Sequence, residues 1–179
     1  NLGIEVVTLP LWVDTVNFNP ISKADNKFLN SLGFAEKFIV LYSGNMGLSH
    51  DLKGLLMAAL LLRAEESIAF VFIGDGARKE EVIDFKNTHN LDNLTILPFQ
   101  PEKILPMSLG MADLGVVTLS KDVSSAMLPS KAIYYMAVGA ALMGVCDEES
   151  QLAGVIEKSE CGLVINPQRS DQIASEILK

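Results

Sequence analysis

The sequence predicts an α/β protein with a doubly wound, six-stranded, mostly parallel Rossmann-like sheet that carries helices on both faces. Short apolar runs alternate along the chain with segments of helical apolar spacing, which is the pattern of successive βα units. The 179 residues, of which 49% are hydrophobic, suffice for one substantial core. In such sheets, ligands bind at the carboxyl ends of the strands, beside the point where the strand order reverses.

Six strands and six helices are expected in alternation. The predicted strands are Phe38 to Ser43, Ala69 to Ile73, Leu94 to Leu97, Leu114 to Thr118, Ala141 to Val145 and Gly162 to Ile165. The predicted helices are Asp51 to Arg63, Ala77 to His89, Pro106 to Ala112, Ser130 to Val138, Ser150 to Lys158 and Ser170 to Leu178. Residues 1 to 25 are expected to form a lead-in strand and an inter-domain linker, and residues 26 to 179 the folded domain.

Charge and composition exclude several classes of protein. The formal net charge of −8 argues against a nucleic-acid or anionic-membrane surface, so any phosphate site must be local. Apolar stretches such as Leu55 to Leu62 are far shorter than the ~20 residues of a membrane span. The two cysteines, Cys146 and Cys161, suit reduced core thiols, which favours a cytoplasmic setting. The absence of a signal-peptide pattern at Asn1, and of a cap on the last helix, suggests a piece of a longer protein.

A glycine loop follows the first strand. Gly44, Asn45 and Gly47 would let the backbone approach a phosphate or sugar closely, although glycines here can equally serve a tight turn. His50 stands where a dinucleotide fingerprint needs its third glycine, so that motif is not supported. Lys53, at the start of the next helix, can contact the same phosphate or simply be a surface lysine.

Two further loops lie at the same predicted edge. Gly74 and Gly76 leave room for a ligand, and Asp75 is expected to cap the helix that follows. Phe99 and Gln100 offer an apolar ring and an amide, which suit a nucleobase; the alternative is a proline-bracketed turn with Phe99 in the core.

The segment from Ser130 to Gly139 is the most informative. Ser130 is expected to cap a helix that ends at Gly139, so that the first-turn amides and Lys131 point together at the binding edge. A lysine in the first turn is unfavourable against the helix dipole unless an anion compensates it, which favours a phosphate contact over a surface role. Tyr134 lies three residues on and faces nearly the same side.

No metal site is predicted. His50 and His89 have no carboxylate or cysteine at ligand spacing and are expected at surface positions, and there is no Asp-x-Asp to hold a divalent ion. No nucleophile with a histidine base stands out either, so the catalytic residues stay unknown from the residues alone.

Five ordered motifs resemble the C-terminal domain of family-four glycosyltransferases of the GT-B fold, and in particular the subgroup that builds bacterial surface polysaccharides. They are Leu9-Pro10-Leu11-Trp12-Val13-Asp14-Thr15, Tyr42-Ser43-Gly44-Asn45-Met46-Gly47, Ile73-Gly74-Asp75-Gly76, Ala112-Asp113, and Pro129-Ser130-Lys131 with Tyr134-Tyr135-Met136-Ala137-Val138-Gly139.

The resemblance implies retaining transfer of a sugar from a nucleoside diphosphate sugar, without a metal or other cofactor. The acceptor would be held by an N-terminal domain absent from this chain, so the chain alone is expected to be inactive. The full-length enzyme could be peripheral to the inner face of the cell membrane. The family's paired glutamates fall at Ala126 and Tyr134, so their contacts cannot be carried over, and its diphosphate-binding Arg and Lys correspond approximately to Asn45 and Lys53.

Other functions remain open on the same fold. A sugar-nucleotide epimerase or an inverting transferase would share most of these motifs. A receiver-type signalling domain is a poorer match, because Pro98 and Gly44-Asn45 stand where it needs acidic residues.

Overall fold

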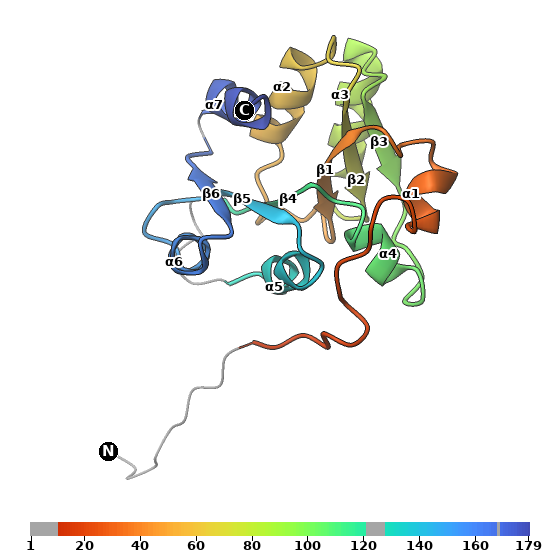
Figure 1. Ribbon diagram of the computed structural model, residues 1–179. Helices are drawn as coiled ribbons and strands as arrows, with labels where there is room; N and C mark the ends of the chain where they lie inside the picture. The colour runs from red at the N-terminus through yellow and green to blue at the C-terminus, as the bar shows by residue number, and fades with distance from the viewer. Residues whose placement is uncertain (1–10, 121–127, 168) are drawn as a thin grey trace.

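The computed structural model describes residues 11–120, 128–167 and 169–179. Its strands are β1 (Phe38–Ser43), β2 (Ile68–Ile73), β3 (Leu94–Leu97), β4 (Leu114–Thr118), β5 (Ala141–Val145) and β6 (Gly162–Ile165). They form one sheet in the order β3-β2-β1-β4-β5-β6, and every neighbouring pair runs parallel (Figure 1). The order reverses between β1 and β4, which confirms the doubly wound prediction.

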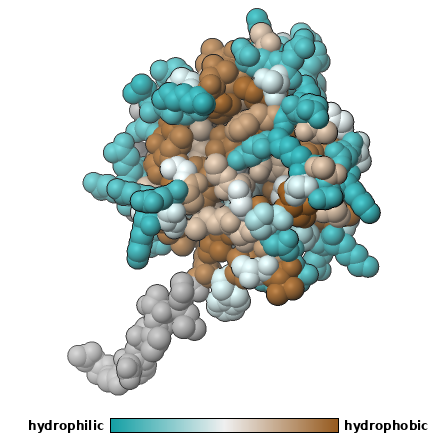
Figure 2. Space-filling model, viewed as in Figure 1, coloured by the Kyte–Doolittle hydropathy of each residue, from teal (hydrophilic) through white to brown (hydrophobic). Residues whose placement is uncertain are grey.

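Helices cover both faces of this sheet. They are α1 (Lys27–Ser31), α2 (Lys53–Leu61), α3 (Lys79–His89), α4 (Leu105–Leu109), α5 (Ser130–Ala137), α6 (Gln151–Ser159) and α7 (Ser170–Ile177). One apolar core joins the sheet to α2, α3 and α7, and a second joins its other face to α1, α4, α5 and α6 (Figure 1). Figure 2 shows apolar residues gathered through the middle of one side of the molecule, with polar and charged residues around them. Among the described residues, no helix has the length and hydropathy needed to cross a bilayer.

The helices differ from the prediction at α1 and at the start of α3. Helix α1 was not predicted, because it has only five residues, of which Leu29 alone is buried, and so carries almost no periodic signal. Its cap is Asn26, whose side chain accepts a hydrogen bond from the Leu29 backbone N–H at 3.0 Å. Asp75 was expected to cap α3, but that helix begins later, with Arg78 as its N-cap, and Asp75 instead pairs with Lys79 at 2.9 Å.

The stretch before α1 packs against the domain. The Phe18 ring meets the Tyr134 ring edge-on, with 4.7 Å between centroids. The Lys23 ammonium lies 2.7 Å from the Asp113 carboxylate, which also accepts the backbone N–H of Ile39 at 2.7 Å. Asp113 therefore ties this segment to the start of β1.

Tyr135 bridges the point where β1 and β4 part. The two strands pair only at Val40 with Leu114 and at Leu41 with Gly115. Beyond that pair, the Tyr135 hydroxyl accepts the Ser43 backbone N–H at 2.9 Å and donates to the Leu41 carbonyl at 3.0 Å. Its ring lies over Gly115, where a Cβ atom would collide with it. A side chain thus supplies the hydrogen bonds that the diverging strands cannot.

We expect Tyr135→Phe to lower the free energy of unfolding by about 1–3 kcal/mol, because it leaves a buried backbone N–H unpaired. Chemical denaturation measures the change. Tyr134→Phe is the matched control, since Tyr134 is half-buried and one position earlier on α5; it should cost less than about 0.5 kcal/mol. Equal losses in the two variants would contradict the bridging role.

Candidate functional site

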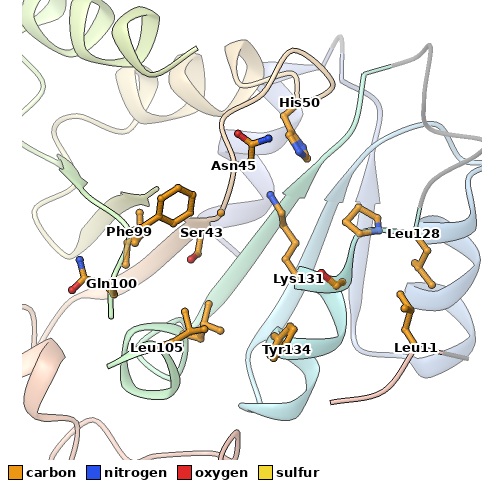
Figure 3. Close-up of a pocket in the computed structure, with 15 residues that line it drawn as sticks. Leu11, Ser43, Asn45, His50, Phe99, Gln100, Leu105, Leu128, Lys131 and Tyr134 are labelled. Atoms are coloured by element: carbon orange, nitrogen blue, oxygen red, sulfur yellow. The ribbon is translucent and has the colours of Figure 1, made fainter. Parts of the chain in front are cut away.

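A cleft of about 620 Å³ opens at the carboxyl edge of the sheet, beside the β1–β4 switch point. Its described lining combines the β1–α2 loop, the loop after β3, helix α4 and the start of α5 (Figure 3). The lining residues are Leu11, Ser43, Gly44, Asn45, His50, Ile73, Phe99, Gln100, Leu105, Leu109, Leu128, Pro129, Ser130, Lys131 and Tyr134. The cleft therefore lies where doubly wound folds bind their ligands.

The rim along β1 and β2 consists of two interlocked glycine turns. Gly44 and Gly74 have φ values of +126° and +145°, which residues with side chains rarely adopt. A Cβ atom on Gly74 would collide with the carbonyl of Gly44, so the two backbones can approach this closely only because Gly74 lacks a side chain. Met46 N–H also donates to the Asp75 carbonyl at 2.7 Å. The first glycine loop is thus held in place by the second.

Helix α5 points its N-terminus into the cleft. The prediction that Ser130 caps this helix was wrong: Pro129 is the N-cap residue, Ser130 is the first helical residue, and no side chain caps the helix. At the other end, Gly139 has the expected left-handed φ of +77°. The N–H groups of Gly139 and Ala140 close the helix on the carbonyls of Met136 and Tyr135. An uncapped N-terminus leaves first-turn amides available to a bound anion.

The Lys131 ammonium is the most unusual group in the cleft. Its Nζ atom is buried, no described atom forms a hydrogen bond with it, and it lies 4.3 Å from the centre of the Tyr42 ring. A Cβ atom at Gly44 would sit 3.4 Å from it, so the lysine passes directly over the glycine loop (Figure 3). Burial lowers the pKa of Lys131 from 10.5 to about 8. An unpaired buried cation is costly, and an anion in the cleft would pair with it.

His50 was predicted at the surface, and the structure places it in this cleft instead. Its side chain is buried, and Nδ1 lies 2.7 Å from the Thr118 carbonyl oxygen. Burial and the positive charge of Lys131 lower the pKa of His50, against the opposing effect of the Thr118 hydrogen bond. The histidine and the lysine thus approach the same space from two elements (Figure 3). No periodic signal pointed to His50, because it lies in a loop.

The far side of the cleft is apolar. Phe99 is 57% exposed and lines the cleft, so the alternative that placed it in the core is wrong. The Gln100 side-chain nitrogen donates to the Pro98 carbonyl at 2.8 Å. This bond fixes the orientation of the side-chain amide, so that its oxygen points away from that carbonyl. Leucines from the N-terminal segment, from α4 and from the residues just before α5 complete this side, and Tyr134 lies among them (Figure 3). None of these leucines was predicted as a binding residue.

Seven of the ten residues predicted for binding line this cleft together. They are Gly44, Asn45, Phe99, Gln100, Ser130, Lys131 and Tyr134. The other three, Gly47, Lys53 and Gly74, are not among its lining residues; Lys53 is exposed at the start of α2, and Gly74 packs against Gly44. Ala126, one of the two positions of the expected glutamate pair, lies outside the described residues.

The described lining of the cleft carries no carboxylate. Within the described parts of the chain, no cluster of histidine, cysteine, aspartate or glutamate could hold a metal ion. The charged and titratable residues in the described lining of the cleft are Lys131, His50 and Tyr134. This part of the cleft is therefore suited to an anion, although the chain as a whole carries a net charge of −8.

Comparisons with solved structures extend the fold assignment. The C-terminal domain of LpcC from Francisella tularensis, a glycosyl transferase group 1 family protein, superposes with a TM-score of 0.71 at 19% identity; the match covers 93% of this chain and 86% of that domain. Alr3699/HepE of Anabaena, solved in complex with UDP-glucose, gives a TM-score of 0.74 at 16% identity, covering 93% of this chain and 45% of HepE. Both share the fold of this chain.

Sequence comparisons identify the family. The chain is 30% identical over 154 residues to WcaI of Escherichia coli (strain K12), a glycosyl transferase assigned to colanic acid biosynthesis. That match covers 85% of this chain and 38% of WcaI, so the chain spans well under half the length of this relative. A family model described as glycosyl transferases group 1 matches residues 25–179. The motif resemblance is thereby confirmed, and the chain belongs to the group 1 family of glycosyl transferases.

Proposed function

We propose that this chain is the donor-binding half of a retaining glycosyltransferase. Its donor is a nucleoside diphosphate sugar, specifically a UDP-sugar. The acceptor is a surface-polysaccharide or lipid-linked sugar held by a separate N-terminal domain. The observation that carries the proposal is the buried, unpaired Lys131 ammonium beside the uncapped start of α5. HepE, which shares the fold, binds UDP-glucose, and this supports uridine as the base.

The diphosphate would occupy the polar end of the cleft. There it would accept hydrogen bonds from Lys131 and from the first-turn amides of α5, while Gly44 leaves room for its oxygens. As the bond to the sugar breaks, negative charge grows on the leaving diphosphate, and groups already aimed at that charge lower the barrier. Lys131 is thus both a binding group and a stabiliser of the leaving group.

The nucleoside would extend toward the apolar side. A base can stack on the exposed face of Phe99 and donate to the Gln100 side-chain oxygen, while Tyr134 lies within the same lining and would face the ribose. Gly47, Lys53 and Gly74 lie outside the lining, and we leave them out of the proposed contacts.

Calorimetric titration with UDP, GDP, ADP, UMP and uridine tests the proposal. We expect UDP to bind, UMP to bind at least tenfold more weakly, and uridine to bind hardly at all, because most of the affinity comes from the second phosphate at Lys131. Lys131→Ala should remove the preference for diphosphate over monophosphate. Equal binding of UDP, UMP and uridine would contradict a diphosphate site.

We expect nucleotide binding to be independent of divalent metal, since the described lining offers cations and amides but no carboxylate. Affinities measured with a chelator and with added magnesium should agree within about twofold, well below the tenfold that 1.4 kcal/mol represents. Loss of binding in the chelator, with recovery in magnesium or manganese, would show that a metal bridges the diphosphate.

Product analysis of the intact enzyme separates retaining transfer from its rivals. Retention of the anomeric configuration in the product is expected, while inversion, or epimerisation of the free sugar nucleotide, would identify one of the alternatives. The present chain alone should bind the donor and transfer no sugar to an acceptor.

A further inference from the structure

We propose that His50 is a second diphosphate-binding residue, which is neutral in the empty cleft and takes up a proton from solvent when a nucleoside diphosphate sugar binds. This inference rests on the proposed function and adds a residue and a proton to it. The supporting geometry is the placement of the His50 imidazole and the Lys131 ammonium in one cleft whose described lining has no carboxylate (Figure 3).

The tautomer of His50 follows from its hydrogen bond. A carbonyl oxygen can only accept, so Nδ1, at 2.7 Å from the Thr118 oxygen, must carry a hydrogen. In the neutral ring Nε2 then carries a lone pair and no hydrogen, so it can only accept and is repelled by a phosphate oxygen. After protonation, Nε2 becomes an N–H donor that forms a charge-assisted hydrogen bond with phosphate.

The surroundings of His50 keep the ring neutral until an anion arrives. From α5 it faces the Lys131 ammonium, from β1 the Tyr42 ring at 6.2 Å between centroids, and from β4 only a backbone carbonyl. Asp51 follows it in the loop, where its carboxylate accepts the Lys53 backbone N–H. Burial and Lys131 both lower the pKa of His50. A bound diphosphate offsets the positive charge of Lys131 and adds negative charge of its own, so the pKa of His50 must rise.

Because the bound complex holds more protons than the free protein, donor affinity should rise as pH falls through neutrality. At pH 7 a lysine with a pKa of about 8 is already about nine-tenths charged, so Lys131 can take up only about 0.1 proton. His50 is mostly neutral in the free protein at pH 7, because its pKa is lowered from 6.5. Its protonation in the complex should therefore account for most of the uptake, about 0.5 to 1 proton.

Calorimetry at pH 7 in buffers of different ionisation enthalpy measures this uptake. The probe is UDP-glucose, because a nucleoside diphosphate sugar has no phosphate that titrates near neutrality. The test variant is His50→Asn, whose amide can keep the bond to Thr118 but cannot titrate. The control is His89→Asn at the end of α3, where His89 packs on Phe85 outside the cleft.

We expect between about 0.5 and 1 proton for the parent and for His89→Asn, and below about 0.2 for His50→Asn. Equal uptake in the parent and His50→Asn, or binding by the parent without uptake, would overturn the role of His50 and leave the donor site intact. Failure of the parent to bind any nucleotide sugar would instead overturn the proposed function.

A measurement on the unmutated chain guards against a variant that does not fold. The sequence contains only two histidines, so their ring protons are readily assigned by NMR. The Cε1 proton of His50 should move toward its charged position when UDP-glucose is added at pH 7, while that of His89 stays in place. An unshifted His50 signal at saturation would overturn the inference.

Discussion

Replacing Lys131 with alanine should weaken nucleoside diphosphate binding by roughly ten- to a hundredfold, because a charge-assisted contact to phosphate contributes about 1.5–3 kcal/mol. The buried Lys131 ammonium forms no hydrogen bond with any described atom, so its donors are free for the phosphate oxygens. Lys131→Arg should recover only part of the affinity, since a planar guanidinium does not fit a space shaped for a compact cation. Calorimetric titration measures the affinity of the parent, of Lys131→Ala and of Lys131→Arg for the diphosphate.

Lys79 is the matched control. It also stands in the first turn of a helix that follows a glycine loop, but its ammonium pairs with Asp75 at 2.9 Å, and it does not line the cleft. We expect Lys79→Ala to bind the diphosphate as the parent does, within about twofold. Unchanged affinity in Lys131→Ala would make Lys131 a lysine without a role in binding.

The same lysine should reduce the stability of the empty protein. A folded-state pKa of about 8, against 10.5 in the unfolded chain, corresponds to about 3 kcal/mol of destabilisation at neutral pH. Between pH 8 and 10.5 the unfolded chain binds more protons, so the parent should gain stability as pH rises through this window. Lys131→Met should be about 1–3 kcal/mol more stable than the parent at pH 7 and lose that advantage by pH 10. If Lys131→Met is more stable than the parent but binds the diphosphate more weakly, then Lys131 is kept for ligand binding at the expense of stability.

Replacing Gly74 with alanine should be the most damaging single change to the fold around the site. The new Cβ would collide with the Gly44 carbonyl, at a φ of +145° that alanine rarely adopts. Strain and overpacking together should lower the free energy of unfolding by about 3 to 5 kcal/mol. Because the Gly44 loop borders Lys131, any relaxation of that loop should also weaken diphosphate binding.

Gly154→Ala is the control for this substitution. Gly154 is exposed in the middle of α6, has no positive φ, and a Cβ there would meet nothing within 4 Å. This change should stabilise the protein by about 0.5–1 kcal/mol through lower backbone entropy in the unfolded chain. Thermal or chemical denaturation compares the two variants, and a mild effect of Gly74→Ala, under about 1 kcal/mol, would mean that the two glycine turns are not interlocked.

The fold could be predicted from sequence because its signals are local and repeated. The six strands are short apolar runs such as β2, all of whose residues are buried, and each is followed by a polar or glycine-containing turn. Helix α1 could not be found in this way, since it has only five residues and buries only Leu29. Caps were harder still: Pro129 and Arg78 begin their helices without a side-chain hydrogen bond, so the usual capping residues nearby misled the prediction.

The candidate site was predictable only where residue type and position agreed. Lys131 stood out because a cation at a helix N-terminus is unfavourable without an anion. His50 did not stand out, because its burial depends on Thr118, which lies 68 residues away in the sequence. The two residues meet only because the strand order places β4 beside β1. The leucines of the apolar side depend in the same way on how distant loops meet at one edge of the sheet.

The pKa of the Lys131 ammonium, measured by NMR on ¹³C-labelled lysine Cε with and without saturating UDP, tests the diphosphate assignment most directly. We expect a value near 8 in the free protein and a clear rise on binding, because phosphate oxygens stabilise the charged form. A free value near 10.5, or a value that does not change when UDP is bound, would contradict the placement of the diphosphate at Lys131.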